Sequence, residues 1–176
     1  MQKGKLEIIC GSMFSGKTKE LIERANNAIK LGKKVIGFKP KIDNRYQSNQ
    51  IVSHNKNSFD CVIIKQASDM INISKAHEVI IIDEIQFFDS TVINVCLELI
   101  NDGKRVIGAG LDMDYEGNPF GSVPQLLAIA DDIKKLRAKC ICGNAANISY
   151  RLISEKKQIL IGEKNEYEPR CRNCIN

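Results

Sequence analysis

The stretch from Gly11 to Thr18 constrains the fold most strongly, because its spacing, G-x-x-x-x-G-K-T, is that of a phosphate-binding loop. The apolar run LEIIC over residues 6–10 precedes it and is typical of a buried strand. Residues 18–31 follow with a helical pattern that Gly32 closes. The apolar face of this helix is predicted to hold Leu21, Ala25, Ala28 and Ile29. A strand, this loop and a helix in that order predict a site for a nucleoside triphosphate.

Short apolar runs alternate with helical patterns along most of the 176 residues. Further strands are predicted at 34–39, 61–65, 78–84, 105–110 and 134–138, and further helices at 91–102 and 122–133. Such alternation predicts the α/β class, a phosphate-loop domain with a parallel sheet and right-handed crossovers. Near residue 139 the pattern changes to cysteines and polar residues. We therefore expect two domains, 1–138 for nucleotide binding and a small zinc-ribbon-like lobe over 139–176.

The chain carries a net charge of +5, with lysines scattered apart from short clusters at 33–34 and 134–135. Solvated faces and binding of anionic nucleotides explain this excess as well as nucleic-acid binding does. No run approaches the roughly 20 apolar residues that a membrane span needs. The start, MQKGKLEII, has neither the apolar segment nor the cleavage site of a secretory signal. We expect a soluble, cytoplasmic protein with no membrane or nucleic-acid partner.

The phosphate loop predicts specific chemistry. Gly11 and Gly16 allow backbone turns that let the loop amides face the phosphates, and Lys17 can reach the β- and γ-phosphates. The Thr18 hydroxyl can hold Mg²⁺. In such proteins an aspartate at the end of a neighbouring strand binds the magnesium shell, and the predicted strand ends in Asp83.

Glu84 follows that aspartate and is the best-placed candidate for a general base towards an acceptor hydroxyl. Two alternatives remain open at this point. Glu84 is a solvated loop carboxylate, or it orients an attacking water as in an ATPase. These motifs alone do not separate a kinase from an ATPase.

The chain has seven cysteines. Three lie singly within apolar runs and are predicted to be small core residues, namely Cys10, Cys61 and Cys96. The other four form two close pairs, Cys140-x-Cys142 and Cys171-x-x-Cys174, separated by 28 residues. Four thiolates suit a tetrahedral structural Zn²⁺ with no open position, and reduced free thiols are the alternative. The long segment between the pairs is typical of a loop that covers an active site.

Several phrases together resemble the signatures of type II thymidine kinases. GSMFSGKT resembles the family's G-P-M-[FY]-[SA]-G-K-[ST] loop. The further matches, in order, are KPKIDNRY (39–46), IDEIQFF (82–88), GLDMDYEGNPFG (110–121) and GEKNEYEPRCRNC (162–174). The resemblance covers nearly the whole chain and implies a RecA-like core with a zinc-tied lasso over a nucleoside.

The resemblance also implies roles for residues. ATP is the donor, thymidine or deoxyuridine the acceptor, Glu84 the base, and Lys17 its catalytic partner on the phosphates. The implied ATP and metal contacts are Gly11, Ser12, Met13, Phe14, Ser15, Gly16, Lys17, Thr18, Asp43, Asn44, Arg45, Asp83, Glu84, Ile85 and Gln86. The implied thymidine contacts are Met13, Phe87, Leu111, Tyr115, Phe120, Gln158, Ile159, Leu160, Ile161, Gly162 and Tyr167. A homotetramer and feedback inhibition by dTTP are implied as well.

The chain departs from the family pattern at three places. Ser12 replaces the usual proline of the loop, Tyr115 stands where phenylalanine is common, and the first cysteine pair is one residue short. Two rival functions use the same motifs. One is a RecA-like ATPase with a zinc-ribbon module for nucleic acid, although no basic stripe with interleaved aromatics is present. The other is a nucleotide-binding regulator without turnover. The intact set of Lys17, Thr18, Asp83 and Glu84 argues against this function.

Overall fold

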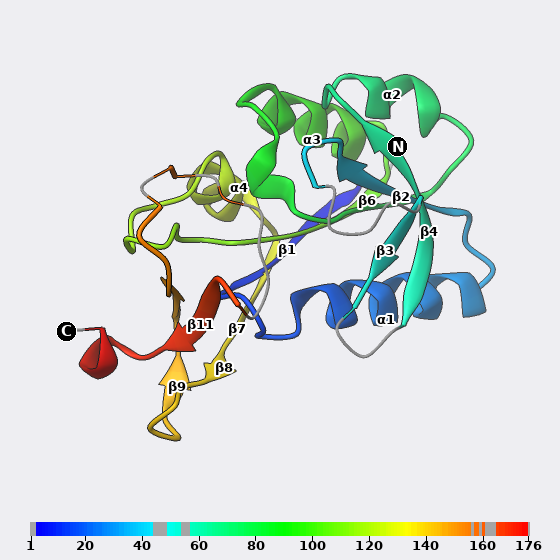
Figure 1. The fold of residues 1–176 in the computed structure, drawn as a ribbon. Helices are drawn as coiled ribbons and strands as arrows, with labels where there is room; N and C mark the ends of the chain where they lie inside the picture. The colour runs from blue at the N-terminus through cyan, green and yellow to red at the C-terminus, as the bar shows by residue number, and fades with distance from the viewer. Residues whose placement is uncertain are drawn as a thin grey trace.

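The computed structural model describes residues 3–43, 49–53, 57–155, 157, 158, 160 and 165–175. Its centre is a seven-stranded sheet of order β3-β4-β2-β5-β6-β1-β7 (Figure 1). The strands are β1 (Lys5–Gly11), β2 (Val35–Pro40), β3 (Gln50–Val52), β4 (Ser58–Ile64), β5 (Val79–Ile82), β6 (Arg105–Gly110) and β7 (Asp132–Leu136). Only the β3–β4 pair among them is antiparallel. The predicted α/β class with a parallel sheet is therefore confirmed.

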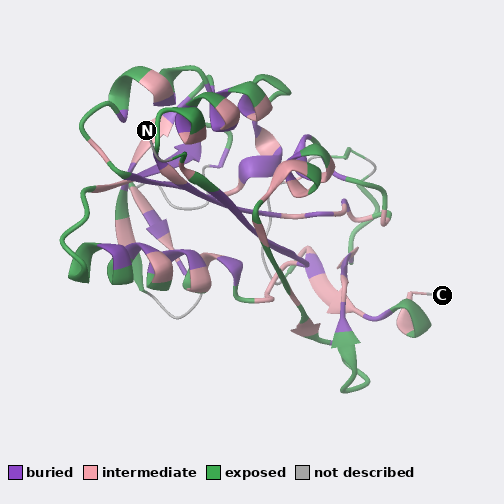
Figure 2. Cartoon of the chain, turned by 180° about the vertical axis from the view of Figure 1, so that it is seen from behind, coloured by how far each residue is buried: buried purple, intermediate pink, exposed green. Residues whose placement is uncertain are grey.

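Helices cover both faces of the sheet (Figure 1). α1 (Lys17–Lys30) packs on one face, and the other carries α2 (Asp69–Ile73), α3 (Thr91–Asn101) and α4 (Val123–Ile129). Successive residues of β1 point to opposite faces, so Ile8 packs with α3 and α4 while Ile9 packs with α1. Figure 2 shows the consequence, since the central strands are buried and the helices expose their outer sides.

The segment after α4 differs from the prediction of one helix over 122–133. The helix ends at Ile129, because Ala130 is extended with ψ 140° and the following residues pair with β1. The Asp131 carboxylate accepts a hydrogen bond from the backbone N–H of Leu6 at 2.8 Å. An edge of β1 without a partner would leave backbone groups unsatisfied, and this need outweighs local helix propensity.

The structure differs from the sequence prediction in two further details. Ile29, placed on the buried face of the first helix, is 48% exposed because that face ends at Ala28. The edge strand β3 was not predicted, since its three residues give too short an alternation to be recognised. The single cysteines are confirmed as core residues, and burial raises the pKa of Cys10 and Cys61 to about 11. Cys96 is also buried, which raises its pKa to about 12.

The C-terminal part contains two small antiparallel pairs. They are β8 (Ala138–Lys139) with β9 (Ala145–Ala146), and β10 (Ile148–Arg151) with β11 (Tyr167–Arg170). Cys140, Ala146 and Cys171 form a small separate core there. The division of the chain near residue 139 stays a prediction.

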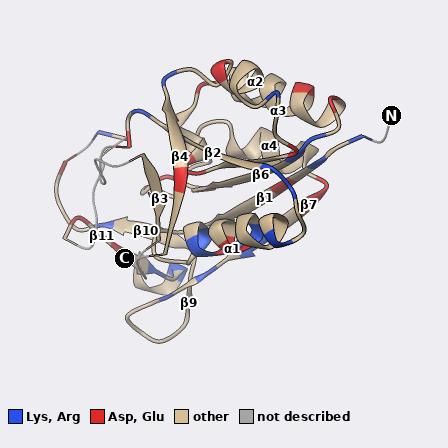
Figure 3. Cartoon of the chain, turned by 90° about the vertical axis from the view of Figure 1, so that its right-hand side faces the viewer, with Lys and Arg blue, Asp and Glu red and all other residues tan. Residues whose placement is uncertain are grey.

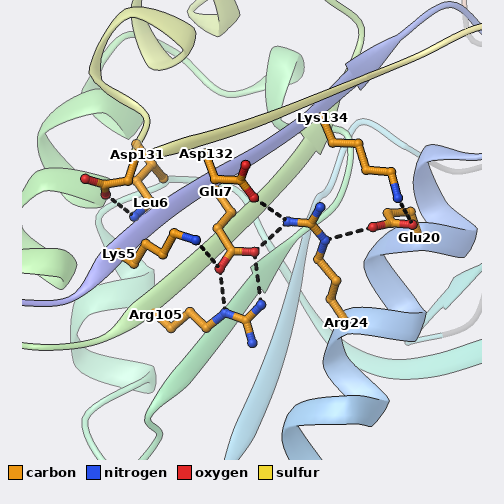
Figure 4. A network of polar contacts seen from close by, with 9 residues as sticks. All are labelled: Lys5, Leu6, Glu7, Glu20, Arg24, Arg105, Asp131, Asp132 and Lys134. Carbon is orange, nitrogen blue, oxygen red and sulfur yellow. Dashed lines mark hydrogen bonds and ion pairs between the residues drawn. The ribbon is translucent and has the colours of Figure 1, made fainter.

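The helix α1 carries charged residues of both signs along its length (Figure 3). The Glu7 side chain on β1 is buried among cations and is only 4% exposed. It accepts hydrogen bonds from Arg24 Nη1 at 2.5 Å and Arg105 Nε at 2.7 Å (Figure 4). Burial alone would raise the pKa of Glu7, but Arg105 and Arg24 lower it below its ordinary value. The contacts tie α1, β1 and β6 together.

Among the described residues, none of the helices has the length and apolar character to span a bilayer.

Candidate active site

The phosphate loop connects β1 to α1 through two glycines with positive φ, 141° at Gly11 and 91° at Gly16. A Cβ on Gly11 would stand 2.1 Å from the carbonyl oxygen of Leu136, so no larger residue fits. Lys17 folds back over the loop, and its Nζ donates to the Ser12 carbonyl at 2.8 Å. The buried Ser15 hydroxyl oxygen has no hydrogen-bond partner among the described residues. A phosphate oxygen would satisfy it, so the loop fits its predicted ligand.

Asp83 follows β5 and lies beside the start of α1. The Thr18 Oγ1 lies 3.4 Å and 3.5 Å from the two carboxylate oxygens of Asp83. This hydroxyl and carboxylate are the oxygen donors that Mg²⁺ prefers, so the pair fits the ion. One detail of the prediction needs correction, because β6 lies between β5 and β1 and the two strands are not neighbours. The start of α1 lies across β6, and Thr18 at this start therefore comes close to Asp83 at the end of β5.

Glu84 adopts the left-handed backbone conformation, with φ 51°. Phe14 in the phosphate loop, with φ 62°, is the other non-glycine residue with positive φ in the described chain. Such conformations cost about 1–3 kcal/mol each and concentrate at functional sites. Both residues line the same cavity, which indicates that the strain serves the site.

Gln86 holds the Glu84 carboxylate, donating from Nε2 to Oε2 at 2.6 Å. Its amide oxygen accepts from the backbone N–H of Leu111 at 3.0 Å. A Cβ on Gly110 would come within 2.5 Å of that amide oxygen, which explains a glycine at the end of β6. Gln86 is therefore fixed at both ends of its side chain, and it orients Glu84 towards the cavity.

One cavity of about 420 Å³ runs from the phosphate loop to the C-terminal strands, within the range of small-molecule sites. Its phosphate end includes Met13, Phe14, Ser15, Gly16, Lys17, Thr18, Asp43, Asp83 and Glu84. Its other end includes Phe87, Leu111, Tyr115, Phe120, Gln158, Leu160 and Tyr167. The rings of Phe87 and Phe120 meet edge to face with centroids 5.9 Å apart. An apolar aromatic slot thus adjoins a phosphate-binding end.

Other predicted contacts lie off the cavity wall. Gly11 and Ser12, at the start of the loop, are buried and do not line the cavity. Gln86 contacts Glu84 without lining the cavity, and Ile85 packs in the apolar core. The remaining predicted contacts lie outside the described residues, namely Asn44, Arg45, Ile159, Ile161 and Gly162.

Some wall residues were not found from the sequence. They are Lys39, Gln50, Ile51, Val52, Ser53, Asp114, Ser149 and Arg151, together with Lys19 at the start of α1. Lys39 and Asp114 lie within phrases that the resemblance already used, so those phrases were a signal. Ser149 and Arg151 lie in a polar strand without a motif, and only the fold brings them to the cavity.

The four clustered cysteines meet although their pairs are far apart in the sequence. Their Sγ atoms all lie within 4.8 Å of one another, and those of Cys142 and Cys171 are 3.6 Å apart. A tetrahedral Zn²⁺ with bonds of about 2.3 Å requires sulfurs about 3.8 Å apart, so the cluster fits the ion. Backbone N–H groups of Cys142 and Cys171 lower the pKa of Cys140 to about 6. The short C-x-C pair therefore does not prevent a four-thiolate arrangement.

Two hydrogen bonds join this lobe to the phosphate loop. Ser12 Oγ donates to the Ala146 carbonyl at 3.3 Å, and the Met13 N–H donates to Ser149 Oγ at 3.0 Å. The serine that replaces the family's proline thus makes a contact that proline could not make.

Known proteins share sequence with this chain over nearly its whole length. A family model described as thymidine kinase matches residues 4–175. A thymidine kinase of Bacteroides thetaiotaomicron is 49% identical over 98% of this chain and 87% of its own length. One of Rhodothermus sp. is 46% identical over 98% of this chain and 81% of its own. Among solved structures, replication initiator DnaA bound to AMPPCP and single-stranded DNA aligns with a TM-score of 0.48 and 17% identity, over 77% of this chain and 41% of that one.

Proposed function

Because the chain belongs to the thymidine kinase family, we propose that it transfers the γ-phosphoryl group of ATP to the 5′-hydroxyl of thymidine, giving dTMP and ADP. The observation that carries this proposal is the single cavity that joins a phosphate loop to an aromatic slot. An ATPase needs only the first of these ends. A kinase needs both, because its second substrate must lie in line with the γ-phosphate.

The donor end binds the triphosphate. The loop amides and the Lys17 ammonium, which lies over the loop, would contact the phosphates, and Thr18 and Asp83 would hold the magnesium ion. Bound Mg²⁺ supplies charge neutralisation at the phosphate oxygens. Asp43 lines the cavity at the same end and completes its acidic rim. Because the Lys17 ammonium lies at the phosphate end, it stabilises the negative charge of the transferred phosphoryl group.

The acceptor end binds the nucleoside. Phe87, Phe120 and Leu111 form an apolar slot for the pyrimidine, and backbone groups near Gln158 and Leu160 read its edge. Glu84 takes the proton of the 5′-hydroxyl, in the orientation that Gln86 fixes. Deoxyuridine, which lacks only a methyl group, is proposed as a poorer substrate.

The remaining features of this proposal rest on family resemblance. The cysteine cluster binds a structural zinc, the protein is a cytoplasmic homotetramer, and dTTP inhibits it as the end product. Its product supplies nucleotide salvage and DNA synthesis. Metal analysis tests the zinc, sedimentation tests the homotetramer, and titration with dTTP tests the inhibition.

Formation of ADP from ATP, measured with thymidine, with DNA and with neither, tests the function. We expect turnover only with thymidine, and dTMP in amounts equal to ADP. Turnover stimulated by DNA, with steep salt dependence, would instead favour the rival nucleic-acid ATPase. Absence of turnover with full ATP binding would favour the regulator.

Replacing the base sharpens this assay. Glu84→Gln should lower kcat by roughly 10²- to 10⁴-fold, because proton transfer is lost, and should leave the KM for ATP nearly unchanged. The exposed Glu98 on α3 gives the matched control, Glu98→Gln, with normal turnover. Near-normal transfer by Glu84→Gln would refute the assignment of the base.

A further inference from the structure

Arg151 is a buried cation at the acceptor end of the cavity. It is the last residue of β10, pairs with Tyr167 on β11, and is only 7% exposed. Arginine is rarely so buried without partners that satisfy its charge. Those partners therefore indicate what the residue does.

The guanidinium donates to oxygens of the loop that follows β10. Its acceptors are the carbonyls of Glu155 at 2.7 Å, Lys157 at 2.6 Å and Gln158 at 3.2 Å, and the Tyr167 hydroxyl at 2.7 Å. The Tyr167 hydroxyl in turn donates to the Leu160 carbonyl at 2.8 Å. A planar fork with five N–H groups can serve such diverging acceptors, which an ammonium cannot match. One side chain thus fixes the described part of residues 155–160.

Arg151 also contacts the loop that follows β6. Its Cζ lies 3.6 Å from the centroid of the Tyr115 ring, a close cation–π contact. Gln158 Nε2 donates to Asp114 Oδ2 at 3.0 Å across the same seam. Arg151 consequently lies where the β6 loop and the β10 loop meet, and both loops line the acceptor end.

We propose that Arg151 is a positioning residue for the nucleoside. Directly and through Tyr167, it holds the cavity-lining residues Gln158 and Leu160 and the Tyr115 ring in place at the acceptor end, and so sets the affinity for the nucleoside. This inference rests on the proposed function for the identity of the occupant. Among the described residues, the hydrogen bonds and ring contacts of Arg151 lie at the acceptor end and not in the phosphate loop, so we expect the affinity for ATP not to depend on it.

Arg170 provides a matched control on the same strand pair. Its Cζ lies 3.6 Å from the centroid of the Tyr150 ring, and it donates to the Cys174 carbonyl at 3.1 Å. It does not line the cavity. Arg170→Ala therefore removes an equally close cation–π contact from the same lobe without touching the acceptor end.

Steady-state kinetics test the proposal on the full-length, zinc-loaded protein. Arg151→Ala should raise the KM for thymidine roughly 10- to 100-fold, because misplaced binding groups lose that much, with the KM for ATP within about threefold. Arg151→Lys should lie between Ala and the wild type. Arg170→Ala should stay within about threefold for both substrates. A KM for thymidine that is unchanged in Arg151→Ala, or that rises together with the KM for ATP, overturns the proposal.

Hydrogen exchange on the nucleoside-free protein gives a readout independent of turnover. Arg151→Ala and Arg151→Lys should speed exchange at the described residues 152–155, 157, 158 and 160 while β1 and α1 keep wild-type protection. Unchanged exchange at these residues refutes the positioning role even if the wild type phosphorylates thymidine. If the wild type does not act on thymidine but exchange changes as expected, the proposed function fails and the positioning role of Arg151 stands. If the alanine variant loses zinc or melts early, the lysine variant decides the outcome.

Discussion

The donor end of the cavity lies on a sheet that helices cover on both faces, whereas the acceptor end is shared between segments that follow β5 and β6 and the C-terminal strand pair β10–β11. The sheet contributes two large apolar clusters, whereas the separate core of the C-terminal lobe is small and consists of Cys140, Ala146 and Cys171. The lobe is held instead by polar contacts between distant residues and by a site that fits zinc. Damage to the lobe should therefore spare the donor end, while damage to the loop should leave the lobe folded.

Loss of the metal should have the largest effect. Cys171→Ser removes one of the four proposed zinc ligands, and structural zinc contributes on the order of 10 kcal/mol to the folding of small sites. We expect thymidine phosphorylation to become undetectable while ATP binding, measured by calorimetry, persists. Circular dichroism should show the helices intact.

The matched control is Cys61→Ala, which changes a buried cysteine outside the cluster and should keep the zinc. If Cys171→Ser abolished ATP binding as well, the two ends would form one cooperative unit. The independence of the donor end would then be wrong.

The same contrast explains what could be predicted from the sequence. The phosphate loop, Asp83 and Glu84 are neighbours of apolar runs, so local spacing was sufficient to place them. Arg151 and Ser149 act through residues far away in the chain, and no local pattern marks them. The cysteine cluster lies between these cases, because its chemistry is visible in the spacing but its closure needs the fold.

The errors in secondary structure have the same origin. The segment 130–133 has moderate helical character, yet the β1 edge recruits it as β7. The position of β6 between β1 and β5 is a matter of topology that strand patterns do not encode. Sequence patterns therefore predicted elements that fold by local preference, and failed where a distant partner decides.

Removing the loop cation should have the next largest effect. Lys17→Met deletes a buried ammonium that we propose contacts the phosphates, and loss of one such electrostatic group lowers kcat on the order of 10³-fold. Hydrogen exchange in the C-terminal lobe should remain that of the wild type. Lys30→Met, at the exposed end of α1, is the control and should keep full turnover. A lobe that loosens in Lys17→Met would contradict the separation of the two ends.

The buried Glu7 tests the stability of the sheet. Glu7→Gln removes the charge that Arg24 and Arg105 share, while Arg24 keeps Glu20 and Asp132 as partners. Because the arginines are partly exposed, we expect a loss of about 1.5 kcal/mol, the lower end for hydrogen bonds to charged groups. Since the folded-state pKa of Glu7 lies below its unfolded value, its contribution is complete above that unfolded value and is lost as the pH falls through the folded pKa. Denaturant unfolding should show the wild-type advantage at pH 7, shrinking below about pH 4.

Glu78 is the matched control, since it pairs with Lys33 at 2.7 Å but both side chains are about half exposed. Glu78→Gln should barely change the free energy of unfolding, because solvent screens such pairs. Equal losses in the two variants would show that burial does not govern these ion pairs.

The smallest expected effect comes from a hydrogen bond that joins the donor end to the C-terminal lobe. Ser12→Ala removes the hydrogen bond from the phosphate loop to the Ala146 carbonyl in the lobe. A hydrogen bond of this kind is worth about 1 kcal/mol, so the KM for ATP should rise roughly fivefold. Ser90→Ala, at the exposed start of α3, is the control. Because the Ser12 carbonyl accepts a hydrogen bond from Lys17 at the donor end, whereas Ser12 meets the nucleoside slot only through the lobe, the KM for thymidine should change less than that for ATP. Equal changes in both would mean that this bond transmits strain across the whole cavity, and the two ends would then have to be treated as one site.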